Sequence, residues 1–368
     1  MKITILFLGK VGAGPRYTLE MAKALSEKPN IELQIILSSL IDNHDDWLKI
    51  EKKGNVKITY FNTYKNKVEF LFAFINLFKS YKISRCIKKF NPIVLYIPMI
   101  SLLNPGVLLF LRKINIYYTL HDPIEHVGEA NFFVELIRKF EIKKAKKIIL
   151  LNVFFKRYVC DFYKKQEEDI MYVPHAAFFS NEEVTSNNCF LDKILFVGRI
   201  EEYKGIGLLL DAFSEAIKLR PNLKLTIAGR GELSPYLDKI SKLSDNIEII
   251  NRWLKDEEVE QLIKNHDFVI LPYIDASQSG VVPVVFANKR TVIATNKGAL
   301  AEQIPNGLGF VVEPNHLDIS KKICEIYDDG FSNLAFMNEK AYQYAIKNLT
   351  WQSSAETLIS HFNNEYYR

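Results

Sequence analysis

Apolar residues along this chain gather in short runs, which are separated by stretches whose apolar positions follow a helical period. The runs are nearly continuous and rich in β-branched and aromatic residues, as in strands that are buried on both faces. They predict strands at 2–9, 31–39, 56–62, 93–98, 114–122, 146–152, 169–175, 193–200, 224–230, 246–253, 268–274, 291–296 and 308–314.

The stretches between the runs predict amphipathic helices, most clearly at 207–219 and 256–265. Strands that alternate with helices in this way form parallel sheets covered by helices on both faces. The fold class that follows is α/β, with doubly wound parallel sheets.

A polar segment at 177–192, rich in Ser, Asn and Glu, divides the chain into halves of similar size. A chain of 368 residues is also longer than a single hydrophobic core supports. We therefore expect an N-terminal domain at 1–180 and a C-terminal domain at 190–347.

The composition is that of an ordinary globular protein, with 48% apolar and 25% charged residues. No cleavable signal peptide is recognisable after the first apolar run, and the apolar segments 68–78 and 97–111 are too short or interrupted to cross a bilayer. The four cysteines lack the spacing of a metal or redox site, which favours buried free thiols in a reducing compartment.

The formal net charge of +5 conceals an uneven distribution. Residues 1–180 hold 28 Lys and Arg against 17 Asp and Glu, whereas the remainder holds 20 against 26. A basic half suggests an anionic partner. No nucleic-acid-binding motif is present, so nucleic acid is not expected, but the mixture of aromatic residues and lysines at 70–90 suits an anionic bilayer surface. A core-facing helix with a solvated basic edge explains the same segment.

The segment "GRIEEYKG", which follows the apolar run at 193–197, holds two cations between glycines. Arg199 can bind a diphosphate through paired hydrogen bonds, and Lys204 adds a point charge beside the start of the next helix. This arrangement predicts a phosphate site. The alternative is an exposed turn in which the two cations pair with Glu201 and Glu202.

The end of the strand at 268–274 leads through polar residues into another helix. Asp275 lies there, where ligands of open parallel sheets bind, and its carboxylate can accept hydrogen bonds from sugar hydroxyls. The alternative for Asp275 is a loop or cap residue. We expect free backbone amides at the start of that helix, from Gln278, Ser279, Gly280 and Val281.

A third strand end places Gly298 before an expected helix, with Glu302 in its first turn. The helix dipole alone explains a first-turn glutamate. A role for Glu302 in binding is therefore only weakly predicted.

The first half carries a glycine loop after its first strand, formed by Gly12, Ala13 and Gly14, which lacks the third glycine of a dinucleotide fingerprint. It does allow backbone to approach a ligand. His121 follows a strand, a position from which side chains enter a cleft. A metal held by His121 and its acidic and histidine neighbours up to His126 matches no specific ligand pattern, so no metal is expected.

Taken together, these segments resemble the glycosyltransferases of family 4, with best agreement across residues 193–315. The motifs that carry the resemblance are "FVGRIEEYKGIGLLLDAF", "IAGRGE", "ILPYIDASQSGVVP", "VIATNKGALAEQI" and "GFVVEP", supported by "TLHD" and "VPH" earlier in the chain. The resemblance implies the GT-B architecture, in which two Rossmann-like domains face an interdomain cleft. It also implies that the terminal helix at 351–368 crosses back to the first domain.

The resemblance further implies retaining transfer of a sugar from a nucleotide donor, a UDP-sugar being favoured, without a metal or another cofactor. Arg199 and Lys204 match the family's diphosphate-binding pair, Asp275 matches the acidic residue near the donor sugar, and His121 would line the sugar site. Other donor contacts are implied for Gly198, Gln278, Ser279, Gly280, Val281, Gly229, Arg230 and Glu302. The loop at Gly12, Ala13 and Gly14 would approach the acceptor or the β-phosphate.

The chain departs from the family pattern at the usual glycine pair after "VIAT", which is reduced to Gly298-Ala299, and at the residue expected to hold the ribose. Many members carry a second acidic residue eight positions after the first, which holds the ribose, whereas the comparable stretch here reads "GVVPVVFA" and offers only Val282 to Val285. Recognition of the nucleotide must then come from elsewhere.

Family habit and the basic first half together suggest a glycan or undecaprenyl-type lipid-linked acceptor in the synthesis of O-antigen, capsule or another cell-surface polysaccharide. The expected location is cytoplasmic, peripheral on the inner face of the membrane. Two other functions remain open: a nucleotide-sugar 2-epimerase of the same architecture, and a non-catalytic sugar-nucleotide-binding subunit.

Overall fold

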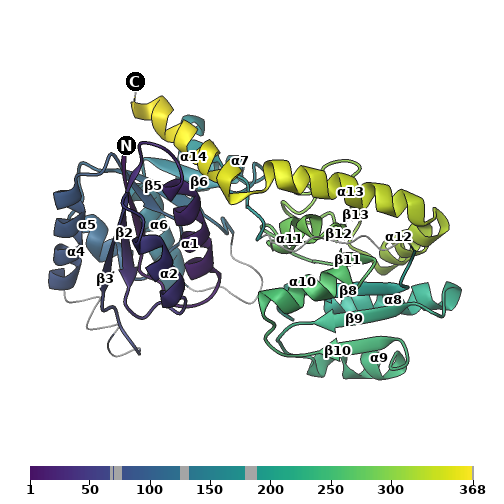
Figure 1. The fold of residues 1–368 in the computed structure, drawn as a ribbon. Helices are drawn as coiled ribbons and strands as arrows, with labels where there is room; N and C mark the ends of the chain where they lie inside the picture. The colour runs from purple at the N-terminus through teal and green to yellow at the C-terminus, as the bar shows by residue number, and fades with distance from the viewer. Residues whose placement is uncertain (67–68, 70–76, 125–131, 179–188, 367–368) are drawn as a thin grey trace. The chain divides into compact units, whose positions relative to one another are not determined.

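The computed structural model describes residues 1–66, 69, 77–124, 132–178 and 189–366. These residues fall into two compact units (Figure 1). The first comprises those within Met1–Pro123, Asn131–Pro174 and Trp351–Arg368, and the second those within Ile124–Ala130 and His175–Thr350. The chain thus leaves the first unit between Pro174 and His175 and returns to it between Thr350 and Trp351.

The first unit is built on a seven-stranded sheet with the order β3-β2-β1-β4-β5-β6-β7, and every pairing in it is parallel. Its strands are β1 (Lys2–Phe7), β2 (Glu32–Ser38), β3 (Val56–Phe61), β4 (Val94–Ile97), β5 (Asn115–Leu120), β6 (Lys147–Leu150) and β7 (Ile170–Tyr172). The interior strands are buried on both faces, as their apolar runs predict.

Helices cover both faces of this sheet (Figure 1). One face packs against α4 (Leu77–Phe90), α5 (Asn104–Leu109), α6 (Phe132–Lys144) and α7 (Lys156–Tyr163), which share one hydrophobic core with the strands. The other face carries α1 (Ala13–Ser26), α2 (His44–Glu51) and the terminal helix α14 (Trp351–Tyr366). Because α14 packs on α1, the end of the chain completes the first unit.

The second unit is built on a six-stranded parallel sheet with the order β10-β9-β8-β11-β12-β13. Its strands are β8 (Lys193–Val197), β9 (Lys224–Ala228), β10 (Ile247–Ile250), β11 (Phe268–Leu271), β12 (Thr291–Thr295) and β13 (Phe310–Val312). Its α-helices are α8 (Ile206–Leu219), α9 (Leu237–Lys242), α10 (Asp256–Lys264), α11 (Val281–Ala287), α12 (His316–Asp328) and α13 (Phe331–Asn348). The pairs α8 with α12 and α11 with α13 pack closely.

The α/β class and the doubly wound parallel sheets are therefore confirmed, and each of the thirteen expected strands is present. In each sheet the strand order reverses once, between β1 and β4 and between β8 and β11. Ligands of open parallel sheets bind beyond the carboxyl ends of the strands at such a reversal. A ligand site is therefore expected at the carboxyl edge of each sheet, near these reversals.

The structure also bears on the expectations about membrane-spanning helices, the four cysteines and the two segments at 68–78 and 177–192. None of the described helices is both long and apolar enough to cross a membrane. The four cysteines are free, but the expectation that they are buried is wrong for all except Cys324, and Cys189 is exposed. Most of the polar segment at 177–192 and of the apolar segment at 68–78 lies outside the described residues.

Candidate functional site

Four loops of the second unit follow parallel strands and therefore lie at one edge of its sheet. They come after β8, β9, β11 and β12, and all of the expected donor residues lie on them or at the start of α11. The loops after β8 and β9 run side by side, since the Gly198 amide donates to the Ala228 carbonyl and the Ile200 amide donates to the Arg230 carbonyl. Arg230 and Gly229 thus flank Gly198, with the Arg230 side chain exposed.

The loop after β8 packs directly on the loop after β11. Gly205 has a φ of 74°, and a Cβ at this position would overlap the Pro272 carbonyl oxygen. Only glycine allows both this backbone conformation and so close an approach. The Tyr203 carbonyl accepts a hydrogen bond of 2.9 Å from the Ile274 amide and one of 3.4 Å from the Asp275 amide. Tyr203 thereby fixes Asp275 next to the loop that carries Arg199 and Lys204.

Lys204 lies in the short 3-10 helix η2 (Glu202–Lys204), and its ammonium sits over the face of a buried tyrosine ring. The Nζ atom is 3.8 Å from the ring centroid of Tyr273 and 4.9 Å from that of Tyr203. The ring quadrupole holds the cation in place without neutralising it. Among the described residues Lys204 has no carboxylate partner, so the alternative of pairing with Glu202 does not hold for it.

Arg199 is held in part by its own loop. Its Nη2 donates to the Tyr203 hydroxyl at 2.9 Å, and its Nη1 lies 4.0 Å from Glu201 Oε1. Both side chains of that ion pair are about half exposed, so the pair is weak. The guanidinium therefore lies at the surface of the edge, oriented by Tyr203, and can turn toward an anion.

The expected free amides at the start of α11 need a correction. The Ser279 amide donates to Gln303 Oε1 at 2.7 Å, and the Val281 amide donates to Ser279 Oγ at 3.2 Å. Gln303 also donates to the Ser279 carbonyl, and Tyr273 bonds the Ser279 hydroxyl. These contacts hold the loop after β11 rigidly, and two of the four amides are already engaged.

Gln278, in the same loop, has a different environment. Its Oε1 atom is buried and has no hydrogen-bond partner within the described part of the chain. A buried amide oxygen without a donor costs free energy, which a ligand hydroxyl at this position would recover. Gly280 caps α11 beside the His175 ring, since a Cβ on Gly280 would lie 3.8 Å from His175 Cε1 and Nε2.

The helix expected after Gly298 is absent, and residues 298–303 form turns instead. Gly298 has a φ of 51°, and a Cβ there would overlap the Ala276 carbonyl oxygen, so this segment is pressed against the loop after β11. Glu302 is exposed on one of these turns rather than in the first turn of a helix. The dipole argument for Glu302 therefore does not apply.

The departure from the family pattern has a structural counterpart in α11. Val282, Val285 and Phe286 are each at most 1% exposed and belong to the core of the unit. The inward face of α11 thus presents no polar group to a ribose.

The first unit places its candidate residues at the carboxyl edge of its own sheet. His121 follows β5, and its Nε2 lies 2.9 Å from the Pro98 carbonyl at the end of β4. Burial lowers the pKa of His121 below its ordinary value, against the opposing effects of Asp122 and of the bond to Pro98. A neutral imidazole is therefore present at pH 7, with its proton on Nε2 toward the Pro98 carbonyl, so that Nδ1 can accept a hydrogen bond.

The glycine loop after β1 is shorter than expected, because α1 already begins at Ala13. Gly12 caps the helix with a φ of 90° and is exposed, as is Ala13, whereas Gly14 is buried in the first turn. The start of α1 therefore lies open at the same edge of the sheet as His121.

No group of three or more His, Cys, Asp or Glu side chains that could hold a metal ion occurs among the described residues. Two of the considered ligands, Glu125 and His126, lie outside them. Sequence reasoning missed three residues that build the carboxyl edge of the second sheet: Tyr203 and Tyr273, whose rings lie against the Lys204 ammonium, and Gln303, which bonds the loop after β11. Tyr203 lies inside the "GRIEEYKG" motif, where its spacing from Arg199 was a usable signal.

The chain is similar to known glycosyltransferases. Residues 192–329, which contain the carboxyl edge of the second sheet, match the family model of the group 1 glycosyl transferases. The chain is 30% identical over 232 residues to an uncharacterized glycosyltransferase of Methanocaldococcus jannaschii, covering 56% of each. It is 26% identical over 185 residues to the lipopolysaccharide 1,2-N-acetylglucosaminetransferase of Salmonella typhimurium, covering 46% of this chain and 48% of that protein. The chain thus spans about half the length of the curated relatives it matches.

Among solved structures, HepE of Anabaena in complex with UDP superposes with a TM-score of 0.74. The match covers 99% of this chain and 100% of that one at 14% sequence identity. A likeness at this identity establishes the fold of two Rossmann-like parallel-sheet domains over the whole chain.

Proposed function

We propose, from the match of residues 192–329 to the family model of the group 1 glycosyl transferases, that this protein is a retaining, metal-independent glycosyltransferase. Its donor is a nucleoside-diphosphate sugar, a UDP-sugar being favoured. Its acceptor is a hydroxyl of a glycan or of a lipid-linked oligosaccharide used in cell-surface polysaccharide synthesis. The proposal assigns donor binding to the second unit and acceptor binding to the first.

One observation carries the proposal: Lys204 lies on the Tyr273 ring without a carboxylate partner among the described residues, in the loop that Gly205 presses against Pro272. A backbone hydrogen bond from the Asp275 amide to the Tyr203 carbonyl holds Asp275 against the same loop. A diphosphate needs cations, and a sugar needs a hydrogen-bond acceptor near them. Both are supplied at the reversal of strand order between β8 and β11.

The chemistry that these residues support is departure of a nucleoside diphosphate. The bond between the anomeric carbon and the β-phosphate oxygen breaks, which adds negative charge to the phosphate while positive charge spreads over C1 and the ring oxygen. Lys204 and Arg199 stabilise the developing anion, and the ring-held ammonium needs little reorganisation to do so. In this proposal the two cations take the place of the divalent ion used by metal-dependent transferases.

The acceptor hydroxyl attacks the anomeric carbon from the side of the leaving group, and its proton passes to the departing phosphate. No side chain at the carboxyl edge of the second sheet is required as a covalent nucleophile. Asp275 and the buried oxygen of Gln278 orient the sugar through its hydroxyls. His121, neutral at pH 7, is assigned a role in lining the sugar site on the family resemblance alone.

The acceptor class rests on weaker support. The lipopolysaccharide 1,2-N-acetylglucosaminetransferase of Salmonella typhimurium, which is similar to this chain, is named for transfer to a lipopolysaccharide. The basic first half favours a location on the inner face of the cytoplasmic membrane, where a lipid-linked acceptor would be presented.

The proposal is tested by the melting temperature of the protein in EDTA with UDP, GDP, ADP or CMP added. A nucleotide at about 100 times its dissociation constant stabilises the folded state by about 2.7 kcal/mol, which raises the melting temperature by several degrees. We expect UDP to give this shift and Lys204→Ala to abolish it. Lys239→Ala, which removes an exposed lysine paired with Asp211 on the same unit, is the matched control.

Product analysis with UDP-sugars and glycan or lipid-linked acceptors then separates the remaining functions. A glycoside that forms only with an acceptor, and keeps the anomeric configuration of the donor, is the expected result. An altered sugar nucleotide without an acceptor would identify an epimerase. No shift with any nucleotide, in EDTA or with Mg²⁺, would favour a non-catalytic protein.

A further inference from the structure

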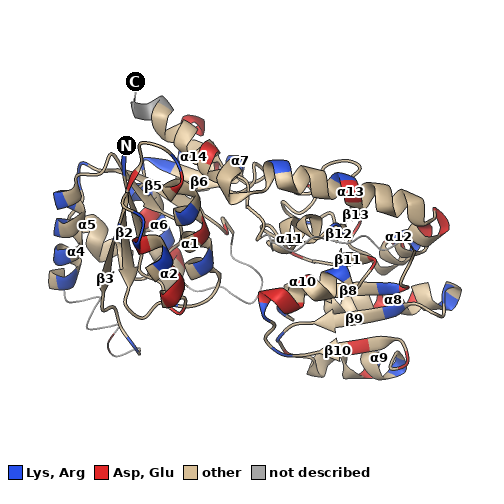
Figure 2. Ribbon diagram, in the orientation of Figure 1, with Lys and Arg blue, Asp and Glu red and all other residues tan. Residues whose placement is uncertain are grey.

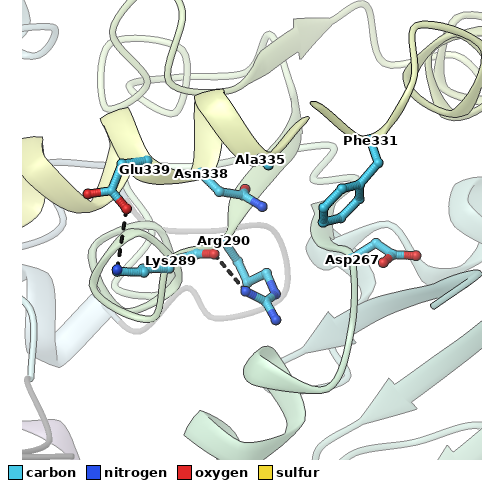
Figure 3. A pocket seen from close by; sticks show the side chains of 7 residues that line it. All are labelled: Asp267, Lys289, Arg290, Phe331, Ala335, Asn338 and Glu339. Carbon is cyan, nitrogen blue, oxygen red and sulfur yellow. Dashed lines mark hydrogen bonds and ion pairs between the residues drawn. The ribbon is translucent and has the colours of Figure 1, made fainter. Parts of the chain in front are cut away.

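One face of the first unit carries positive charge with no carboxylate near it in sequence. Between Glu69 and Asp122 the chain has no Asp or Glu, yet this stretch contains Lys79, Lys82, Arg85, Lys88, Lys89, Arg112 and Lys113. Figure 2 shows blue and no red along α4. The last six of these cations form no ion pair among the described residues, so their charge is not neutralised within the unit.

Exposed apolar side chains lie on the same helix. Leu77, Phe78 and Tyr81 are 43%, 62% and 44% exposed, and all three lie in the first turns of α4. The opposite side of α4 is anchored in the core through Ile83 and Ile87. Neighbouring exposed apolar side chains on a surface helix mark an interaction surface.

The direction of α4 gives this face a definite polarity. α4 connects β3 to β4, which lie in a parallel sheet, so it runs antiparallel to the strands and begins at their carboxyl edge. The exposed apolar residues are therefore near the edge that holds His121 and the start of α1. Lys88 and Lys89, in the last turn of α4, lie toward the opposite edge.

A groove crosses the cationic end of this face. It has a volume of about 630 Å³ and is lined by Lys88, Asn91, Pro92, Leu109, Phe110, Arg112, Lys113 and Ile114. Phe110 packs edge to face on Tyr81, with centroids 5.6 Å apart, which joins the groove to the apolar part of α4. Leu109, on the rim, is 47% exposed.

We propose that this face, defined as α4 together with residues 109–114, docks on the surface of an anionic phospholipid bilayer. Phe78 and Tyr81 enter the boundary between headgroups and acyl chains, and the groove receives a lipid phosphate between Lys88, Arg112 and Lys113. Aromatic and aliphatic side chains beside unpaired cations match such a surface, which offers hydrocarbon beneath a layer of negative charge. A nucleic acid would match the cations but offers no hydrocarbon layer to the exposed apolar side chains.

Docking through this face lays α4 along the bilayer, with Phe78 toward the carboxyl edge of the first sheet and the groove toward the opposite edge. The inference stands on the composition and exposure of the face alone and does not depend on the proposed transferase activity. The readout here is vesicle binding. A negative result would therefore leave the proposed transferase activity standing, and a lack of transferase activity would leave the docking proposal standing.

The experiment is co-sedimentation of the full chain with vesicles of phosphatidylcholine alone and with phosphatidylglycerol added to about 30 mol%. We expect binding to the anionic vesicles only, weakening as salt rises from about 0.05 to about 0.5 M. Each cation near an anionic surface contributes about a fivefold factor in affinity, so Lys88→Glu/Arg112→Glu/Lys113→Glu should weaken binding by at least about 100-fold. Phe78→Ser, a single exposed change, should weaken it by a smaller factor.

The matched control is Lys52→Glu/Lys57→Glu/Lys164→Glu, which reverses the same number of exposed cations on other parts of the first unit. It should bind anionic vesicles nearly as well as the wild type. The melting temperature of each variant is measured first, and only variants that melt at the wild-type temperature are compared. The proposal is overturned if both triple variants bind alike, or if the wild type does not prefer anionic vesicles. It is also overturned if duplex DNA binds more tightly than the vesicles and competes for the same face.

Discussion

Tyr17 and His121 pack edge to face at the carboxyl edge of the first sheet, with ring centroids 4.8 Å apart. Trp351, the first residue of α14, packs edge to face on Tyr17 at 5.0 Å. Both Tyr17 and Trp351 are buried. The helix that ends the chain therefore reaches His121 through one intervening ring.

Trp351→Leu should disturb His121 without touching it. Loss of the indole lets Tyr17 move, so more water reaches His121, and its lowered pKa should rise toward the ordinary value. For the proposed transferase, turnover should fall several-fold, while the affinity for UDP stays unchanged because the residues proposed to bind the donor belong to the other unit. Histidine resonances followed by NMR across pH, together with calorimetric titration of UDP, check this.

Phe362→Leu provides the control on the same helix. Phe362 packs on Tyr117 with ring centroids 4.8 Å apart and is also buried, so its ring lies on a different aromatic partner from that of Trp351. The Phe362→Leu variant should lower the melting temperature as Trp351→Leu does, but it should leave the pKa of His121 unchanged. Equal shifts of that pKa in both variants would show that α14 acts only through stability.

Lys204→Ala and Arg199→Ala should each slow turnover by roughly 10- to 150-fold, since each removes one or two charge-assisted hydrogen bonds to the leaving phosphate. Initial rates with saturating acceptor measure this. Tyr273→Leu removes the ring beneath the Lys204 ammonium. Its turnover should lie between that of the alanine variants and that of the wild type. Near-normal turnover in both alanine variants would refute the diphosphate assignment.

The strands and the positions of the motifs could be predicted from the sequence because their causes are local. Near-continuous apolar runs predict strands that are buried on both faces. Two glycines, Gly198 and Gly298, mark strand ends where the backbones of two loops approach each other. The carboxyl edge then follows from parallel topology alone. Placing Arg199, Lys204 and Asp275 on one edge required no more than this.

The contacts across loops could not be predicted, because they join residues far apart in sequence. Gln303 reaches Ser279 over 24 residues and occupies an amide that a local reading leaves free. The turns at 298–303 replace a helix because the segment is pressed against Ala276, a tertiary constraint that overrides helical propensity. The sequence also did not predict which side of α11, the side of Val282 and Phe286, packs into the core.

Gly298→Ala should destabilise the second unit and impair donor binding together. A Cβ at φ 51° is strained, and it would also displace the Ala276 carbonyl in the loop that carries Asp275. We expect a loss of about 2 kcal/mol or more in unfolding free energy and a weaker shift of melting temperature with UDP. Gly54→Ala is the control, because nothing lies within 4 Å of a Cβ there. An unchanged UDP shift in Gly298→Ala would mean that the two loops are not coupled.

The first unit buries a carboxyl that its proposed function does not use. Glu141, on α6, is fully buried and accepts a hydrogen bond of 2.7 Å from Asn104 Nδ2 on α5. Burial raises the pKa of Glu141 to about 8, outweighing Asn104, Tyr118 and Arg138, which favour the ionised form. The folded protein therefore holds this group as a neutral acid at pH 7.

Glu141→Gln should remove one component of the pH dependence of stability. The folded pKa lies above the ordinary value, so the wild type is stabilised at low pH and loses this contribution as the pH rises from 4.5 to about 8. The slope from this group is at most about 1.4 kcal/mol per pH unit, and it flattens above pH 8. Glutamine stays neutral and keeps an oxygen for Asn104, so its unfolding free energy relative to the wild type should increase with pH. Urea unfolding followed by tryptophan fluorescence at several pH values measures the difference, with the exposed Glu32→Gln as control. A difference between Glu141→Gln and the wild type that is independent of pH would mean that Glu141 is already ionised in the folded protein.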